Sequence, residues 1–131
     1  MFLFHQIDDG RVPSIEYLPC SAITPKAGAM MKITSGNLAF AASTDVPLYF
    51  CMKEGTEAET AGDVIPVIRL HPDMVLQVPT PSSFSQTVGA KVTIGSDSLT
   101  ITNTTGGACE VVYTDDEITR VRIVQPDAAA G

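Results

Sequence analysis

The sequence of 131 residues predicts a small single-domain all-β protein, a β-barrel or β-sandwich built from short hairpins, with an extended N-terminal arm and little helix. Three observations support this fold class. Short runs of residues alternate between apolar and polar, as half-buried strands do. Turn signals interrupt these runs every several residues. No long segment carries the apolar period of about 3.6 residues that marks an amphipathic helix.

Two stretches, residues 28–52 and 89–113, resemble copies of one β unit. They align without a gap at an offset of 61 positions, beginning with Gly28-Ala29 and Gly89-Ala90. Self-similarity at a fixed offset is typical of a supersecondary unit that is used twice. Each copy reads as turn, strand, tight turn and strand, a unit that cannot bury its apolar face alone. Coincidence in a chain rich in Gly, Ala, Ser and Thr is the alternative explanation.

Prolines mark two of the expected strands. Residues 15–22 are broken by Pro19, which predicts an edge or irregular strand. Residues 64–70 are β-branched and apolar around Pro66. Because proline has no N–H to donate to a ladder, we expect this second strand at a sheet edge or with a bulge.

The other strands follow from alternation or from short apolar runs between turn signals. Residues 79–86, rich in proline and serine, form the clearest loop and divide the two halves. The chain therefore divides into an N-terminal arm with the first edge strand (1–24), a β domain (25–124) and a flexible C-terminal tail (125–131). We expect the remaining strands over residues 30–34, 38–42, 46–52, 74–78, 91–94, 99–103, 108–113 and 119–124.

The net charge of −7 argues against nucleic acid as a partner and against an anionic membrane surface, since both attract basic proteins. The apolar start of the chain lacks the basic leader and the long apolar run of a secretory signal. The three cysteines, Cys20, Cys51 and Cys109, form no CxxC pair. We interpret them as small core residues of a protein that folds in a reducing compartment.

No catalytic, cofactor or metal site is predicted. Neither histidine, His5 or His71, lies in a nucleophile motif, although His71 could pair with Asp73 as a local loop contact. The acidic run at residues 115–117 lacks the spacing of a calcium loop and reads as a solvated hairpin tip. No glycine-rich loop precedes a helix in the way that phosphate binding requires. We therefore expect a protein that is not an enzyme.

Two groups of residues are candidates for intermolecular contact. The first is the apolar N-terminus, which is costly to leave in water and must pack on the domain or on a neighbour. The second is an arginine pair on one face of the last strand, which could meet acidic loops or an acidic partner, or could simply be solvated. The candidates are Met1, Phe2, Leu3, Phe4 and Ile7 in the first group and Arg120 and Arg122 in the second.

The succession of short blocks from residue 25 to residue 124 resembles the small decoration proteins, also called cement or head-stabilising proteins, of tailed bacteriophage heads. The shared features are an AGD before an apolar strand, VGAKVTI before a short turn, and a closing strand with alternating arginines. Residues 1–20 are not part of this pattern. The blocks are PKAGAMMKITSGNLAFA, TDVPLYF, AGDVIPVIRLHPDM, VGAKVTIGSDSLTIT and VVYTDDEITRVRIV.

The resemblance implies a structural virion protein on the outer surface of an assembled capsid. Such proteins bind as homo-oligomers, with a trimer favoured over a dimer, and reinforce the shell by bridging subunits of the major capsid protein. It also implies synthesis in the host bacterial cytoplasm. Residues 1–7 are the first choice for the contact with the shell, by strand addition to a capsid edge.

Two other function classes stay open at this point. One is a carbohydrate- or receptor-binding β module of a phage fibre or tail. Sugar sites usually present exposed aromatic platforms, and this chain has no Trp and three Tyr. The other is a small β-barrel enzyme or its regulatory subunit, which ranks last because no acid–base pair can be nominated from the spacing.

Overall fold

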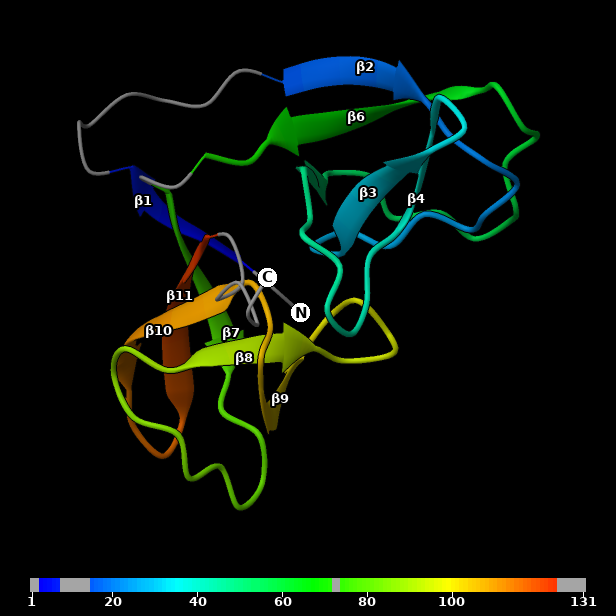
Figure 1. Cartoon of the computed structure of the whole chain (residues 1–131). Coiled ribbons are helices and arrows are strands. Elements are labelled where there is room, and N and C mark those ends of the chain that lie inside the picture. Colours follow the sequence, from blue (N-terminus) through cyan, green and yellow to red (C-terminus); the bar gives the residue numbers. More distant parts are fainter. Residues whose placement is uncertain (1–2, 8–14, 72–73, 125–131) are drawn as a thin grey trace.

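The computed structural model describes residues 3–7, 15–71 and 74–124 (Figure 1). These residues form eleven strands and no helix. The prediction of an all-β protein is therefore confirmed. The strands are β1 (Leu3–Ile7), β2 (Ile15–Pro19), β3 (Met30–Thr34), β4 (Asn37–Phe40), β5 (Tyr49–Cys51), β6 (Val64–Arg69), β7 (Met74–Pro79), β8 (Lys91–Ile94), β9 (Ile101–Thr105), β10 (Cys109–Thr114) and β11 (Ile118–Ile123).

The strands build two antiparallel sheets that pack as an open sandwich. The six-stranded sheet has the order β1-β7-β11-β10-β8-β9, and the five-stranded sheet has the order β2-β6-β5-β3-β4. Neither sheet closes into a barrel, although a bridge between Cys20 and Leu38 draws the two edges of the five-stranded sheet together at one end. Of the two architectures expected from the sequence, the structure has the sandwich.

Apart from β1, the two sheets share one connectivity. The first half of the chain forms a unit of five strands, β2 to β6, and the second half forms a unit of five strands, β7 to β11. In each unit the first strand pairs with the fifth, the fifth with the fourth, the fourth with the second and the second with the third. Each half of the chain therefore folds into its own sheet, and β1 adds a sixth strand to the second one.

A matching turn leads into the second strand of each unit. Gly28 and Gly89 both have a positive φ, of 83° and 98°. The N–H of Gly28 donates to the carbonyl of Cys51 (2.9 Å), and the N–H of Gly89 donates to the carbonyl of Val111 (2.8 Å). Glycine fits this left-handed backbone because it has no Cβ. Whether the two units arose by duplication stays a prediction.

The expected edge position of residues 64–70 is wrong, because β6 lies between β2 and β5. The carbonyl of Pro66 accepts the N–H of Met52 (3.0 Å), one residue beyond the end of β5. In a strand, the N–H and C=O of one residue point to the same neighbouring strand. The position at which Pro66 lacks an N–H therefore also faces the segment just beyond the end of β5. Pro66 and its β2 partner Tyr17 then form a pair that needs no hydrogen bond. The interior proline therefore removes no hydrogen bond from the β2–β6 ladder.

Residues 3–7 are not a detached arm, since β1 pairs antiparallel with β7. The strand β2 lies at the other sheet's edge, as Pro19 predicts. The expected strand at residues 46–52 shortens to β5, whose three residues are buried. The predictions for Met1, Phe2 and the tail at residues 125–131 fall outside the described residues.

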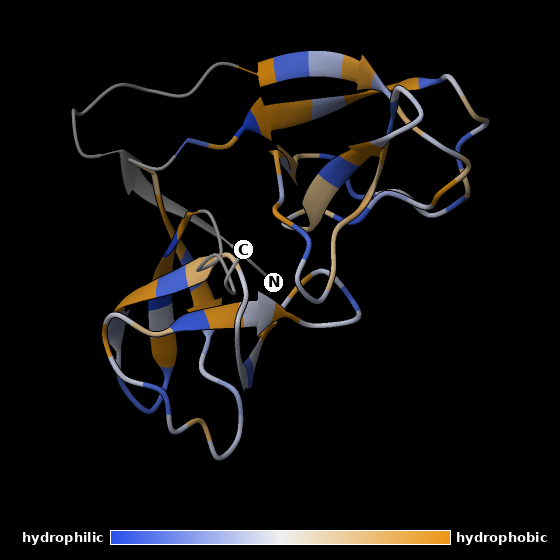
Figure 2. Ribbon diagram, in the orientation of Figure 1, coloured by the Kyte–Doolittle hydropathy of each residue, from blue (hydrophilic) through white to orange (hydrophobic). Residues whose placement is uncertain are grey.

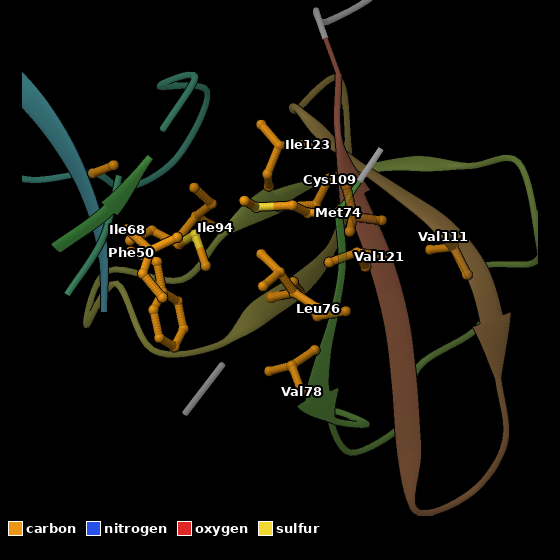
Figure 3. Packing of buried hydrophobic residues seen from close by; sticks show 14 residues of the cluster. Phe50, Ile68, Met74, Leu76, Val78, Ile94, Cys109, Val111, Val121 and Ile123 are labelled. Atoms are coloured by element: carbon orange, nitrogen blue, oxygen red, sulfur yellow. The ribbon is translucent and has the colours of Figure 1, made fainter. Parts of the chain in front are cut away.

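The larger hydrophobic core joins the two sheets (Figure 3). Phe50 and Ile68 come from the five-stranded sheet and pack with residues of the six-stranded sheet, among them Leu76, Ile94 and Val121. A second core lies on the opposite face of the five-stranded sheet and includes Cys20, Leu38, Cys51, Ile65 and Val67. The five-stranded sheet therefore contributes to both cores.

Ser98 ties the second half of the chain to the first. Its side chain is fully buried, and its Oγ donates to the carbonyl of Ala41 (2.5 Å). Its own carbonyl accepts the N–H of Met30 (2.9 Å). Nearby, Ser43 and Ile94 exchange backbone hydrogen bonds of 2.8 and 3.1 Å. These polar contacts fix the position of the sheets that the apolar core holds together.

The β9–β10 connection provides a stability test with a matched control. A Cβ on Gly107 would overlap the backbone of Val92 and Thr93, whereas a Cβ on Gly106 would meet nothing within 4 Å. Gly107→Ala should lower the free energy of unfolding by about 2–3 kcal/mol through overpacking. Gly106→Ala, at φ +97°, should cost only about 1 kcal/mol of backbone strain. Urea unfolding of both variants measures the difference, and equal costs would contradict this packing.

Candidate interaction surface

The apolar N-terminal residues predicted to make contacts lie on an edge strand. Leu3, Phe4 and Ile7 belong to β1, which ends the strand order of the six-stranded sheet. Leu3 pairs with Gln77, and Ile7 pairs with Met74 of β7. The register shifts between Phe4 and Gln6, so β1 carries a bulge or an irregularity. One side of the β1 backbone is therefore used by the protein's own sheet.

The predicted arginine pair lies two strands away from β1. Arg120 and Arg122 alternate along β11 with the buried Val121 and Ile123, so the arginines share the face that points away from the core. Arg120 Nε donates to Gln77 Oε1 (3.3 Å). Gln77 is also the β7 partner of Leu3 in the ladder. The sheet thus places the two groups of predicted contact residues on one row of neighbouring strands.

Tyr113 extends this row on β10. Its Cα pairs with that of Arg120, and the guanidinium of Arg120 lies 5.1 Å from the centre of the Tyr113 ring. The Tyr113 hydroxyl donates to Asp115 Oδ2 (2.7 Å), and this hydrogen bond to the carboxylate raises the pKa of Tyr113. The row therefore presents a cation, an aromatic ring and a carboxylate next to one another. We call Leu3, Gln77, Arg120 and Tyr113 the cross-strand row.

The acidic run at residues 115–117 is the hairpin tip between β10 and β11, as predicted. Asp115 Oδ1 accepts the N–H groups of Glu117 and Ile118, both at 2.8 Å. The hydrogen bond from Ile118, followed by those from Tyr113 and Glu117, lowers the pKa of Asp115. The carboxylate thus closes the turn and positions the end of the row.

His71 and the acidic side chains were the other candidates for chemistry in the sequence. His71 borders a hollow of about 150 Å³ together with apolar residues, which is smaller than the roughly 300–1,000 Å³ of usual ligand pockets. Its predicted partner Asp73 lies outside the described residues. Within residues 15–71 and 74–124, no three His, Cys, Asp or Glu side chains gather closely enough to hold a metal ion.

The cysteines are buried and unpaired, in agreement with their interpretation as core residues. Burial raises the pKa of the Cys109 thiol to about 12. Burial also raises the pKa values of Cys20 and Cys51. Because the thiolate is the reactive form, burial disfavours reaction of all three thiols in the folded protein.

Sequence reasoning missed a second exposed surface, on β2 and β6. Ile15, Tyr17 and Val64 are exposed apolar side chains that lie on one face of this strand pair. The alternation of Ile15, Tyr17 and Pro19 indicated a strand face. It could not indicate that the other sheet leaves this face uncovered.

No family model matches the chain, and no curated protein matches its sequence. The described part of the chain contains no helix long and apolar enough to cross a membrane. The properties of the surface therefore follow from its own residues.

Acid titration tests the role of Asp115 in the turn. Its folded-state pKa is depressed, so its contribution to stability is present above the unfolded pKa of about 3.9 and is lost as the pH falls through the folded value. Asp115→Asn keeps an oxygen acceptor but cannot titrate. The variant should therefore lose less stability than the parent between pH 5 and pH 2, as measured by thermal unfolding at each pH, and an equal loss would contradict this role.

Thiol labelling tests the burial of the cysteines. Ellman's reagent at pH 8 should leave Cys20, Cys51 and Cys109 unmodified in the folded chain and should label all three in guanidinium chloride. Rapid labelling of any one of them without denaturant would show that its strand is not packed as described.

Proposed function

We propose that this chain is a structural virion protein that binds the outer surface of an assembled phage capsid and bridges subunits of the major capsid protein. The observation that supports it is the cross-strand row, because it joins the outermost strand of a sheet to an arginine-bearing face. The resemblance in sequence patterning to capsid decoration proteins gives the partner. The bound form would be a homo-oligomer.

The row offers two kinds of contact to a capsid subunit. An added strand can extend the six-stranded sheet beyond β1, where backbone hydrogen bonds supply affinity without demanding particular side chains. Arg120 and Arg122 on the same sheet can meet carboxylates of that subunit. The two arginines lie on a chain of net charge −7, so they supply local attraction where the overall charge does not.

Stabilisation of the shell would follow from linkage. A protein that binds only the mature lattice stabilises that state by its binding free energy at every site. An oligomer that bridges several capsid subunits adds avidity, so modest contacts from each copy suffice. No bond needs to be made or broken for this function.

Carbohydrate binding is the alternative function. Tyr17 and Tyr113 are exposed and could serve as stacking platforms, but they stand on different sheets. Tyr113 is also engaged by Arg120 and Asp115. A glycan array would distinguish this function from capsid binding.

A charge reversal on the row tests capsid binding. Arg120→Glu should weaken co-sedimentation with assembled capsids lacking this protein by about tenfold or more, because it replaces attraction with repulsion toward acidic groups. Lys53→Glu is the matched control. It makes the same charge change in the loop after β5, where Lys53 pairs with Glu59 (2.7 Å).

Circular dichroism would first establish that both variants fold. Equal binding of the two variants would remove Arg120 from the contact. Failure of the unmodified chain to sediment with capsids would overturn the proposed function itself.

A further inference from the structure

Two arginines of this chain lie over tyrosine rings of the neighbouring strand. Arg69 on β6 is the ladder partner of Tyr49 on β5, and its guanidinium lies 5.2 Å from the centre of that ring. Arg120 on β11 is the ladder partner of Tyr113 on β10, with a corresponding distance of 5.1 Å. A cation at this distance over an aromatic face is attracted by the ring. Each tyrosine therefore restricts where its arginine can lie.

The two pairs occupy corresponding strands of the two units. β5 and β10 are the fourth strands of their units, and β6 and β11 are the fifth. Both arginines face away from the shared core, because their neighbours Ile68 and Val121 point into it. In Figure 2, hydrophilic bands alternate with hydrophobic ones along β11, in agreement with this placement. Arg69 ends β6 whereas Arg120 lies near the start of β11, so the likeness is one of chemistry and strand position.

The first strand of each unit supplies the hydrogen-bond acceptor, and here the two units differ. In the five-stranded sheet, Arg69 Nε and Nη2 donate to the two carboxylate oxygens of Glu16 on β2, at 3.1 and 3.3 Å. In the six-stranded sheet, Arg120 Nε donates to the amide oxygen of Gln77 on β7, at 3.3 Å. A glutamine side chain has one oxygen and no charge, so it can neither pair with two donors of a guanidinium through two oxygens nor neutralise it.

Asp115, the carboxylate at the end of the cross-strand row, is engaged by other donors. Its Oδ2 accepts the Tyr113 hydroxyl, and its Oδ1 accepts two backbone N–H groups of the turn. Three salt bridges join side chains within residues 15–71 and 74–124, and Arg120 takes part in none of them. Its Nη groups have no hydrogen-bond acceptor in that part of the chain. Within these residues, the charge of Arg120 is therefore not paired as that of Arg69 is.

We propose that the guanidinium of Arg120 is an open carboxylate site, and that a capsid subunit fills it with an aspartate or glutamate side chain. The identity of the partner rests on the proposed function, whereas the carboxylate site is a property of the free protein. The Arg69–Glu16 pair shows within the same chain what an occupied site of this kind contains. The two sites differ in the acceptor on the first strand of the unit, which is a glutamate in one and a glutamine in the other.

The surroundings of Arg120 prepare it for a carboxylate. A guanidinium is planar, and its paired N–H donors match the two oxygens of a carboxylate. Because Gln77 already accepts from Nε, the two Nη groups remain for the partner's oxygens. The Tyr113 ring and Gln77 hold the side chain in place before the partner arrives, so less side-chain entropy is lost on binding.

Gln77→Glu tests whether the site is open, because it should close the site from within the chain. The new carboxylate would pair with Arg120 as Glu16 pairs with Arg69, and no donor would be removed. Thr104→Glu is the matched control. It adds the same charge at an exposed position of β9, at the other end of the strand order from β1. Circular dichroism would first establish that both variants fold.

Acetate is the probe for the free protein, and the signal is the Nε–H resonance of Arg120 in a nitrogen-15 NMR spectrum. Acetate replaces chloride at constant ionic strength, so that general screening does not change. In the unmodified chain and in Thr104→Glu, the Arg120 resonance should move about fivefold more than that of Arg69, whose carboxylate partner is already present. In Gln77→Glu this difference should disappear. Equal movement of the two resonances in the unmodified chain, or an undiminished shift in Gln77→Glu, would overturn the proposal.

Co-sedimentation with capsids gives the second measurement. Gln77→Glu should weaken binding by about tenfold, as Arg120→Glu does, whereas Thr104→Glu should bind like the unmodified chain. Equal binding of the two glutamate variants would overturn the claim that a capsid carboxylate fills the site. An acetate response in a chain that does not bind capsids would overturn the proposed function and support the carboxylate site, so the two proposals can fail separately.

Discussion

Packing of Phe50 and Ile68 of the five-stranded sheet against the six-stranded sheet is the interaction on which the rest of the structure depends. Each sheet is built from one unit of short strands, and a domain of about 60 residues is only marginally stable by itself. The shared core buries apolar side chains from both sheets together. The buried hydroxyl of Ser98 and the bridge between Ser43 and Ile94 then determine how the sheets meet.

The same packing decides which surfaces stay open. The six-stranded sheet covers the middle of its neighbour but does not reach the outer part of β2 and β6, where Tyr17 is exposed. Other edges are protected within the chain. β1 covers β7, and Asn103 on β9 bonds to Ser85 and Gln86 of the preceding loop. Among the described residues, β1 is therefore the terminal strand of the six-stranded sheet, and it belongs to the surface proposed for contact.

Features governed by neighbouring residues could be predicted from the sequence. The β3–β4 hairpin follows from Ser35-Gly36, both of which have a positive φ, and the edge position of β2 follows from Pro19. Features governed by distant residues could not. The prediction of an edge position for the strand with Pro66 was wrong. This proline is tolerated in an interior strand because it faces the chain just beyond the end of β5. The cross-strand row could not be predicted either, because Leu3 and Arg120 are linked only by their common ladder partner Gln77 on a third strand.

Native-state hydrogen exchange on Phe50→Ala tests the claim that one shared core stabilises both sheets. Truncating this buried ring should cost about 3–5 kcal/mol. The most protected amides of β11 and of β6 should lose protection by the same amount, although Phe50 lies only in the five-stranded sheet. Loss of protection in β6 alone, with β11 unchanged, would show two independent units and contradict a shared core.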